Sequence, residues 1–197
     1  MKSSGEIKTI ALNTIRAEAE AIKGLENAID NDFSEVVRLI LDSAGRVVVT
    51  GIGKSAIIAN KIVATLNSTG TPSVFMHAAD AIHGDLGIIQ QDDVVICLSK
   101  SGETAEIKVL VPLLRQQGNK LVALVGNRES YLAKAADFIL DATVSKEACP
   151  HNLAPTTSTT VALVIGDALA ITLLRKKDFS KTTNVKANIS ATIRVGR

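Results

Sequence analysis

Five short aliphatic runs between residues 46 and 140 constrain the fold of this chain more than any other feature. Runs of this length without regular polar alternation are typical of strands that are buried on both faces of a parallel sheet. Alternating strands and helices are joined by right-handed crossovers. The sequence therefore predicts an α/β fold, a doubly wound three-layer sandwich of a parallel sheet flanked by helices. The expected strands are 46–50, 73–76, 94–98, 121–125 and 138–140, and the expected helices between them are 55–68, 103–117 and 129–136.

The N-terminal region is expected to be helical. An apolar stripe that runs from Ile7 to Ile22 predicts a long amphipathic helix over 7–29. Asp32 is a candidate N-cap for a second helix, because aspartate accepts hydrogen bonds from the first free N–H groups of a helix. N-terminal helices over 5–43 are therefore assigned to the same domain as the sheet.

The C-terminal region divides into an apolar and a polar part. Residues 156–174 form an expected helix that is apolar on most sides, so burial in the core or in a subunit interface is predicted. Residues 180–197 are polar, rich in Thr and Asn, and without a clear period. The chain of 197 residues is long enough for one domain, which we assign to 1–179, with 180–197 as a loosely ordered tail.

Composition excludes several classes of protein. Tyr131 is the only tyrosine and there is no tryptophan, which argues against a surface that stacks single-stranded nucleic acid. The net charge is close to zero, so neither a nucleic-acid nor a membrane partner is expected. Cys97 and Cys149 do not form a metal-binding pair, and no secretory signal or bilayer-spanning apolar stretch is expected. These features favour the cytoplasm.

A glycine-rich turn follows the first predicted strand. Residues 51–55 resemble two nucleotide-binding motifs and fit neither of them, because a P-loop glycine is replaced by Val48 and no acidic residue ends the next strand. A turn of this kind that opens a helix still offers free N–H groups, and Gly53, Lys54 and Ser55 are candidates for binding one phosphate. The alternative interpretation is an ordinary tight turn with a solvent-exposed lysine.

Hydroxyl side chains follow the third predicted strand and precede the last helix. Ser99, Ser101 and Thr104 surround a predicted helix start, and Thr156 and Ser158 belong to a run of five hydroxyl residues. Hydroxyls and helix N–H groups together bind a phosphate monoester. Helix capping is the alternative interpretation, but capping requires only one hydroxyl.

Two of the three histidines, His77 and His83, lie in one predicted loop. Paired histidines beside a phosphate-binding loop favour a functional role over a structural one. Metal binding is a second interpretation, although no third ligand stands at a standard spacing.

Five motifs in order resemble the SIS domain of bacterial D-arabinose-5-phosphate isomerases. The resemblance covers about residues 45–175. It implies a five-stranded parallel sheet, a homotetramer whose active sites are shared between subunits, and the interconversion of D-ribulose 5-phosphate and D-arabinose 5-phosphate through an enediol without a cofactor. It also implies a role in the synthesis of the acid sugar Kdo for lipopolysaccharide or capsule. The motifs are Gly-Ile-Gly-Lys-Ser at 51–55, His-Gly-Asp-Leu-Gly at 83–87, Ser-Gly-Glu-Thr at 101–104, Lys-Glu-Ala-Cys-Pro at 146–150 with Leu-Ala-Pro-Thr-Thr-Ser-Thr-Thr at 153–160, and Gly-Asp-Ala-Leu-Ala at 166–170.

The resemblance also implies roles for individual residues. Lys54, Glu106 and Glu147 match catalytic positions of the family. His77 matches a histidine that binds an inhibitory zinc ion. The positions that match substrate contacts or the phosphate cradle are Gly70, Thr71, His83, the stretch 109–118, Ser99, Ser101, Thr104 and the run 156–160.

Two departures from the family pattern bear on activity. Many members continue into a pair of regulatory CBS domains, whereas this sequence ends at Arg197, so the resemblance implies a short form. The family also has a His-Pro-Gly-Gly segment with a catalytic histidine where this sequence has 181–188, and no histidine follows His151. Glu106, Glu147 and His83 are then the candidate bases, and a non-catalytic sugar-phosphate sensor is the alternative function.

Overall fold

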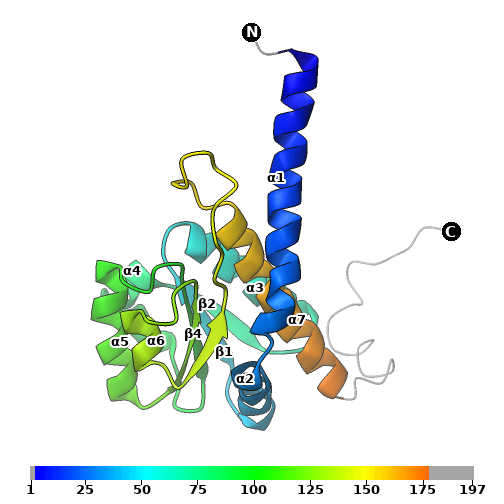
Figure 1. The fold of residues 1–197 in the computed structure, drawn as a ribbon. Coiled ribbons are helices and arrows are strands. Elements are labelled where there is room, and N and C mark those ends of the chain that lie inside the picture. The colour runs from blue at the N-terminus through cyan, green and yellow to red at the C-terminus, as the bar shows by residue number, and fades with distance from the viewer. Residues whose placement is uncertain (1–2, 178–197) are drawn as a thin grey trace, which may run out of the picture.

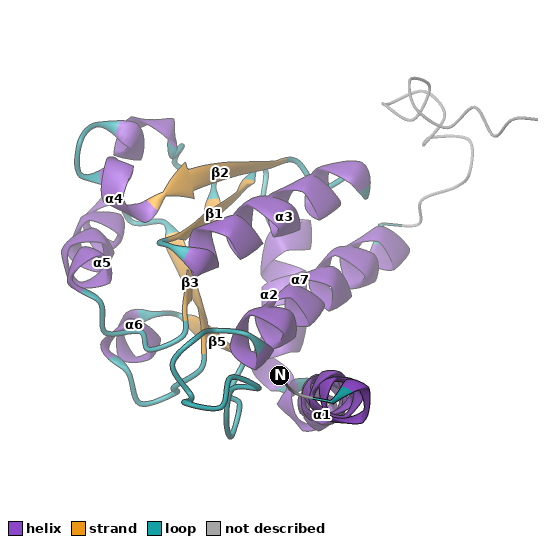
Figure 2. Cartoon of the chain, turned by 90° about the horizontal axis from the view of Figure 1, so that it is seen from above, coloured by secondary structure: helices purple, strands orange, loops and turns teal. Residues whose placement is uncertain are grey.

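The computed structural model describes residues 3–177, in which five parallel strands form one sheet between two layers of helices (Figure 1, Figure 2). The order of strands is β2-β1-β3-β4-β5. All five predicted strands and their parallel pairing are confirmed. The strands are β1 (Val47–Gly51), β2 (Ser73–His77), β3 (Val94–Ser99), β4 (Lys120–Val125) and β5 (Phe138–Asp141).

Helices cover both faces of the sheet, as Figure 2 shows. Successive strand residues point to opposite faces, so Val49 packs with the first layer and Val48 with the second. The predicted three-layer architecture is confirmed. The first layer contains α2 (Asn31–Asp42), α3 (Lys54–Ser68) and α7 (Thr157–Lys176); the second contains α4 (Ala78–Ala81), α5 (Ala105–Gln117) and α6 (Tyr131–Ala135). Two 3-10 helices, η1 (Leu25–Ala28) and η2 (Asp85–Ile88), lie in the connections.

Helix α1 (Ser4–Gly24) extends away from the body of the domain (Figure 1). It confirms the predicted long helix, but none of its residues is buried. Near its C-terminal end the hydroxyl of Thr160 on α7 donates to Glu18 at 3.2 Å. Ile7 and Ile15 remain 59% and 64% exposed. The apolar stripe of α1 is therefore uncovered within a single chain from Ile7 to Ile15, whereas Ile22 at its end is partly buried.

The second helix has a different capping residue from the one expected. The carboxylate of Asp30, not that of Asp32, accepts from the N–H of Phe33 at 3.2 Å and forms the N-cap of α2. The carboxylate of Asp32 accepts instead from the N–H of Ile139 at the edge of the sheet, at 2.9 Å. The prediction of Asp32 as the cap is wrong because its carboxylate is hydrogen-bonded to the backbone of Ile139, a residue far away in the sequence.

Helix α7 corrects a second expectation. By length and composition its 20 residues are apolar enough to cross a membrane, contrary to the expectation that no stretch is long enough. Val161, Ile165 and Leu169 are buried against the sheet and its covering helices, which is typical of the core helix of a globular domain. The predicted domain boundary at 179 and the predicted tail lie outside the described residues.

Candidate functional site

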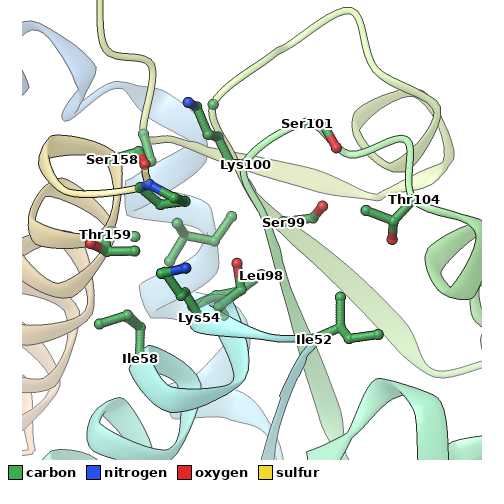
Figure 3. Close-up of a pocket in the computed structure, with 16 residues that line it drawn as sticks. Ile52, Lys54, Ile58, Leu98, Ser99, Lys100, Ser101, Thr104, Ser158 and Thr159 are labelled. Carbon is green, nitrogen blue, oxygen red and sulfur yellow. The ribbon is translucent and has the colours of Figure 1, made fainter. Parts of the chain in front are cut away.

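The site lies where the strand order reverses. From β1 the chain crosses to β2 on one side, and β3, β4 and β5 follow on the other side. Ligands of open α/β sheets bind at such a switch point, beyond the carboxyl ends of the strands. A cavity of about 290 Å³ occurs there (Figure 3). Its lining residues are Ile52, Lys54, Ser55, Ile58, Leu98, Ser99, Lys100, Ser101, Thr104, Leu124, Gly126, Ala142, Pro155, Ser158, Thr159 and Ala162.

The turn between β1 and α3 supplies one of the two lysines that line the cavity. Gly53 has φ +58° and ψ −127°, a conformation that is essentially restricted to glycine, and α3 begins at Lys54 without a side-chain cap. Lys54 and Ser55 line the cavity, as predicted for a ligand-binding turn, whereas Gly53 lines a neighbouring groove with His77. Within residues 3–177, Lys54 has no hydrogen bond or ion pair, so its ammonium group is available to an anion.

The connection between β3 and α5 supplies three hydroxyls. Ser99, Ser101 and Thr104 all line the cavity. Thr104 is the N-cap of α5, yet it forms no side-chain capping bond, and its buried Oγ1 has no hydrogen-bond partner in the described part of the chain. A buried hydroxyl without a partner is costly and calls for an explanation. A polar ligand in the cavity provides one.

Gly102 fixes the shape of this connection. Its φ is +66°, and a Cβ at this position would lie 2.1 Å from Oγ of Ser130. The N–H of Gly102 donates to Oγ of Ser99 at 3.0 Å, which orients that hydroxyl. No residue larger than glycine fits at position 102, so the conformation of the loop that carries the hydroxyls depends on this glycine.

The start of α7 forms the opposite wall. Ser158 and Thr159 lie there across from Ser99 and Ser101 (Figure 3). Thr156 does not line the cavity, and its hydroxyl donates to Oε2 of Glu147 at 3.3 Å. Apart from Lys100, the remaining lining residues are apolar, so the cavity suits a small molecule with one anionic end.

Glu147 is buried beside the cavity, not in its lining. Its carboxylate accepts from Oγ of Ser158 at 2.5 Å and pairs with Nζ of Lys100 at 2.6 Å. Burial alone would raise the pKa of Glu147, but the hydrogen bonds from Lys100 and Ser158 and from the backbone lower it to about 2. Lys100 was not among the predicted site residues, although its place between Ser99 and Ser101 was a signal that could have identified it.

Two further candidate bases lie outside the cavity in a single chain. Glu106 is half-buried in the first turn of α5, immediately after the loop that ends at Thr104, and has no partner among residues 3–177. His83 is exposed in the turn between α4 and η2. Neither side chain belongs to the lining.

Gly70 and Thr71 lie at the opposite end of the strands from the cavity. They precede β2, so they are at the amino ends of the strands, where Nζ of Lys177 donates to both residues at 3.3 Å. The stretch 109–118 runs along α5 towards the same amino ends of the strands. The structure therefore does not bring these predicted substrate contacts to the cavity within one chain.

His77 ends β2 beside the cavity and not in it. Its Nδ1 is buried, has no hydrogen-bond partner in the described part of the chain and lies 3.7 Å from Oδ2 of Asp80. Protein-bound zinc prefers a tetrahedral set with at least three protein ligands. Residues 3–177 contain no group of three or more His, Cys, Asp or Glu side chains that could hold a metal ion, so a zinc ion at His77, which the resemblance implies, would need further ligands from outside these residues or from water.

Fold and cavity together define a doubly wound α/β domain with a cavity at its switch point that is lined by lysine and hydroxyl side chains. Residues 40–172 match the model of the SIS domain, and the chain belongs to the SIS-domain family. The chain is 55% identical over 170 residues to the arabinose 5-phosphate isomerase KdsD of Pseudomonas aeruginosa, and 46% identical over 172 residues to KpsF of Escherichia coli O6:H1. These matches cover 86% and 87% of this chain and 52% and 53% of the relatives.

A solved structure is similar over nearly its whole length. It is the protein c3406 of Escherichia coli CFT073 in complex with arabinose 5-phosphate, with a TM-score of 0.89 and 38% sequence identity, covering 93% of this chain and 97% of that one. The predicted resemblance to the family and its fold are therefore confirmed. The chain spans about half the length of the curated relatives it matches.

Proposed function

We propose that this protein is an aldose–ketose isomerase that interconverts D-ribulose 5-phosphate and D-arabinose 5-phosphate. The observation that carries the proposal is the cavity of about 290 Å³ at the switch point, which is lined by Lys54, without a partner among residues 3–177, and by the hydroxyl residues Ser99, Ser101 and Thr104. A related protein was solved in complex with arabinose 5-phosphate, and several relatives are named arabinose 5-phosphate isomerases. A cavity of this volume holds a single phosphorylated sugar of five carbons better than a dinucleotide.

The reaction needs an anchor, a cation and a base. The hydroxyls around the start of α5 bind the phosphate, and the free N–H groups of that helix add to the attraction. A base removes the proton from C1 of ribulose 5-phosphate while the electrons move onto the oxygen at C2, giving an enediolate. The hydroxyl proton of O1 then moves to the oxygen at C2, O1 becomes the carbonyl oxygen, and the base returns its proton to C2, which gives arabinose 5-phosphate. The ammonium of Lys54 stabilises the negative oxygen of the intermediate.

Three side chains are proposed for the proton transfer, namely Glu106, Glu147 and His83. Glu106 has the strongest support, because it lies close to the phosphate-binding loop in sequence and its carboxylate has no partner in the described residues. When a bound substrate excludes water from a glutamate, desolvation raises the pKa of the carboxyl group towards neutral pH. A histidine is therefore not required as the base. No cofactor enters the proposed chemistry.

We extend the proposal to a homotetramer whose neighbouring subunits complete each site. The uncovered stripe of α1, which includes Ile7, Ile10 and Ile15, supports association, since isolated chains rarely expose a continuous apolar helix face. His83 lies outside the cavity of its own chain, which favours a contribution to a neighbour's site. Light scattering measures the assembly, and an Ile7→Lys and Ile15→Lys double variant is expected to shift it to smaller species.

A reduced, cytoplasmic location and a place in Kdo synthesis are also proposed. Cys97 and Cys149 are both free, as expected for a reducing compartment. The names KdsD and KpsF of the relatives support the Kdo assignment.

Direct assay of ribulose 5-phosphate tests the activity. Conversion to arabinose 5-phosphate, together with exchange of the C1 or C2 proton with deuterium from solvent, is the expected result. The matched control is the Lys54→Ala variant at the same concentration. Binding of both sugar phosphates without turnover or exchange would replace the enzyme with the alternative, a non-catalytic sugar-phosphate sensor.

A further inference from the structure

Glu147 lies at the centre of a hydrogen-bond network next to the cavity. The residue is only 3% exposed, in the connection between β5 and α7. Its two carboxylate oxygens accept from five donors. Oε2 accepts from the N–H of Thr156 at 2.9 Å, the hydroxyl of Thr156 at 3.3 Å and the N–H of Ser158 at 3.1 Å, and Oε1 accepts from the hydroxyl of Ser158 at 2.5 Å and from Nζ of Lys100 at 2.6 Å.

This network performs the capping of α7. The N-cap residue Thr156 forms no side-chain capping bond of its own. The carboxylate of Glu147 takes that role, since it accepts from the N–H groups of Thr156 and Ser158, and its negative charge is favourable at a helix N-terminus. The helix start is therefore occupied by Glu147 and is not free to bind the substrate phosphate.

The same network leaves the carboxylate of Glu147 without a free lone pair that could take a proton from the substrate. A carboxylate offers about four lone-pair positions, and five donors already use them. The bonds from Lys100 and Ser158 hold its pKa near 2 against the opposing effect of burial. Such a carboxylate is a poor base near neutral pH, because efficient proton transfer needs a pKa close to the working pH.

Glu147 also joins two walls of the cavity. Lys100 belongs to the loop after β3 and Ser158 to the first turn of α7, and both line the cavity. Figure 3 shows their side chains on neighbouring parts of the rim. One carboxylate oxygen contacts both groups, so its removal frees the lysine and the serine together.

We propose that Glu147 is a positioning residue, which ties Lys100 to the start of α7 and so shapes the sugar-phosphate cavity, and that another group carries the proton. This inference rests on the proposed isomerase function. It changes the role of Glu147 from that of a base to that of a clamp between two loops. The ammonium of Lys100 is thereby held at the rim as a second cation for the phosphate.

Glu147→Gln separates the two roles. A glutamine oxygen still accepts from the N–H groups of Thr156 and Ser158, and its amide donates to the serine hydroxyl, but the pair with Lys100 is lost. We expect kcat within about tenfold of wild type and KM about 10- to 100-fold higher, as for loss of one charge-assisted contact. The acidic limb of the pH–rate profile should remain. A base would instead lose about 10²- to 10⁴-fold in kcat, together with that limb.

Lys100→Met provides the second arm of the test. It should raise KM about as much as Glu147→Gln, and the double variant should add little, because both substitutions break the same pair. Lys146→Met is the matched control, since Lys146 is an exposed neighbour in the same connection. Additive effects in the double variant, or a kcat loss without a KM change in Glu147→Gln, would overturn the positioning role.

Calorimetric binding of arabinose 5-phosphate distinguishes failure of this inference from failure of the proposed function. If wild type binds the sugar phosphate without turnover, the isomerase proposal fails. The positioning role then still predicts a weaker Kd in Glu147→Gln and in Lys100→Met but not in Lys146→Met. Equal Kd values in all four proteins would overturn it.

Discussion

Lys54 and Thr104 follow the neighbouring strands β1 and β3, line the same cavity, and each carries a polar group without a partner among residues 3–177. The buried hydroxyl is unfavourable in the absence of a ligand, whereas the exposed ammonium group is hydrated and is available to pair with an anion. Both groups become satisfied when a phosphorylated sugar occupies the space between them. Removing the charge of Lys54 and removing the hydroxyl of Thr104 should therefore have separate effects.

Loss of the charge should affect the reaction and leave the fold intact. Lys54→Ala is expected to lower kcat/KM about a hundredfold or more, because the ammonium stabilises the developing oxyanion. Its melting temperature should remain near that of wild type, since Lys54 is exposed and makes no contact that a packed core needs. Steady-state kinetics and thermal unfolding measure the two effects. Lys134→Ala, an exposed lysine on α6, is the control, and near-normal turnover of Lys54→Ala would remove Lys54 from the mechanism.

Loss of the Thr104 hydroxyl should weaken substrate binding without lowering the stability of the fold. Thr104→Val replaces an unpartnered buried hydroxyl by a methyl group of similar size, so stability should be unchanged or higher. KM for both sugar phosphates should rise about tenfold, as for the loss of one hydrogen bond to an anion.

A second threonine provides the comparison for this substitution. Thr50 is fully buried in β1, its hydroxyl also lacks a partner in the described residues, and it does not line the cavity. Thr50→Val should stabilise the protein by about 1 kcal/mol in urea unfolding and leave KM unchanged. Equal changes of KM in the two variants would contradict a ligand-binding role of Thr104.

The stability that Glu147 contributes should depend on pH in a defined direction. The pKa of Glu147 is lowered from 4.5 to about 2 in the folded protein. A group with a lowered pKa stabilises the fold above its unfolded pKa, and the contribution is lost as pH falls through the folded value. Wild type should therefore exceed Glu147→Gln in unfolding free energy by up to about 3 kcal/mol above pH 5. Chemical unfolding from pH 7 to pH 2 checks this, and a difference that stays constant over the range would refute it.

Metal ions should inhibit and not activate. The proposed enediol chemistry uses an ammonium and a carboxylate, so EDTA should leave turnover unchanged. Zinc should lower turnover by binding at His77 together with ligands from outside residues 3–177 or from water, because Nδ1 of His77 has no hydrogen-bond partner among those residues and lies near Asp80. His77→Asn should then relieve the inhibition, while His151→Asn, in an exposed loop, should not. Loss of activity on chelation that one metal restores would make the protein a metalloenzyme.

The sequence predicted the sheet and one half of the candidate site for a common reason. Parallel strands end at one edge, so Lys54 after β1 and Ser99 after β3 had to meet there once the strands were recognised. Gly70 and Thr71 follow a helix, not a strand, and lie at the other edge. The resemblance to a family could suggest their role but could not supply their position.

Tertiary pairing explains what the sequence did not predict. The pair between Lys100 and Glu147 joins loops that are far apart in the chain, and no local pattern signals it. In the same way Asp30 caps α2 because Asp32 is engaged by Ile139. Local propensity indicates which residues suit a role, and long-range contacts decide which one takes it.

The two free cysteines give the wild-type protein a built-in reporter. Burial in β3 raises the pKa of Cys97 to about 12, whereas backbone N–H groups of Ala154, Leu153 and His151 lower the pKa of Cys149. Alkylating reagents attack the thiolate, so they select Cys149 and spare Cys97 in the folded state. Cys149 stands two residues beyond Glu147, and a fluorophore attached there without any mutation follows the segment that Glu147 anchors.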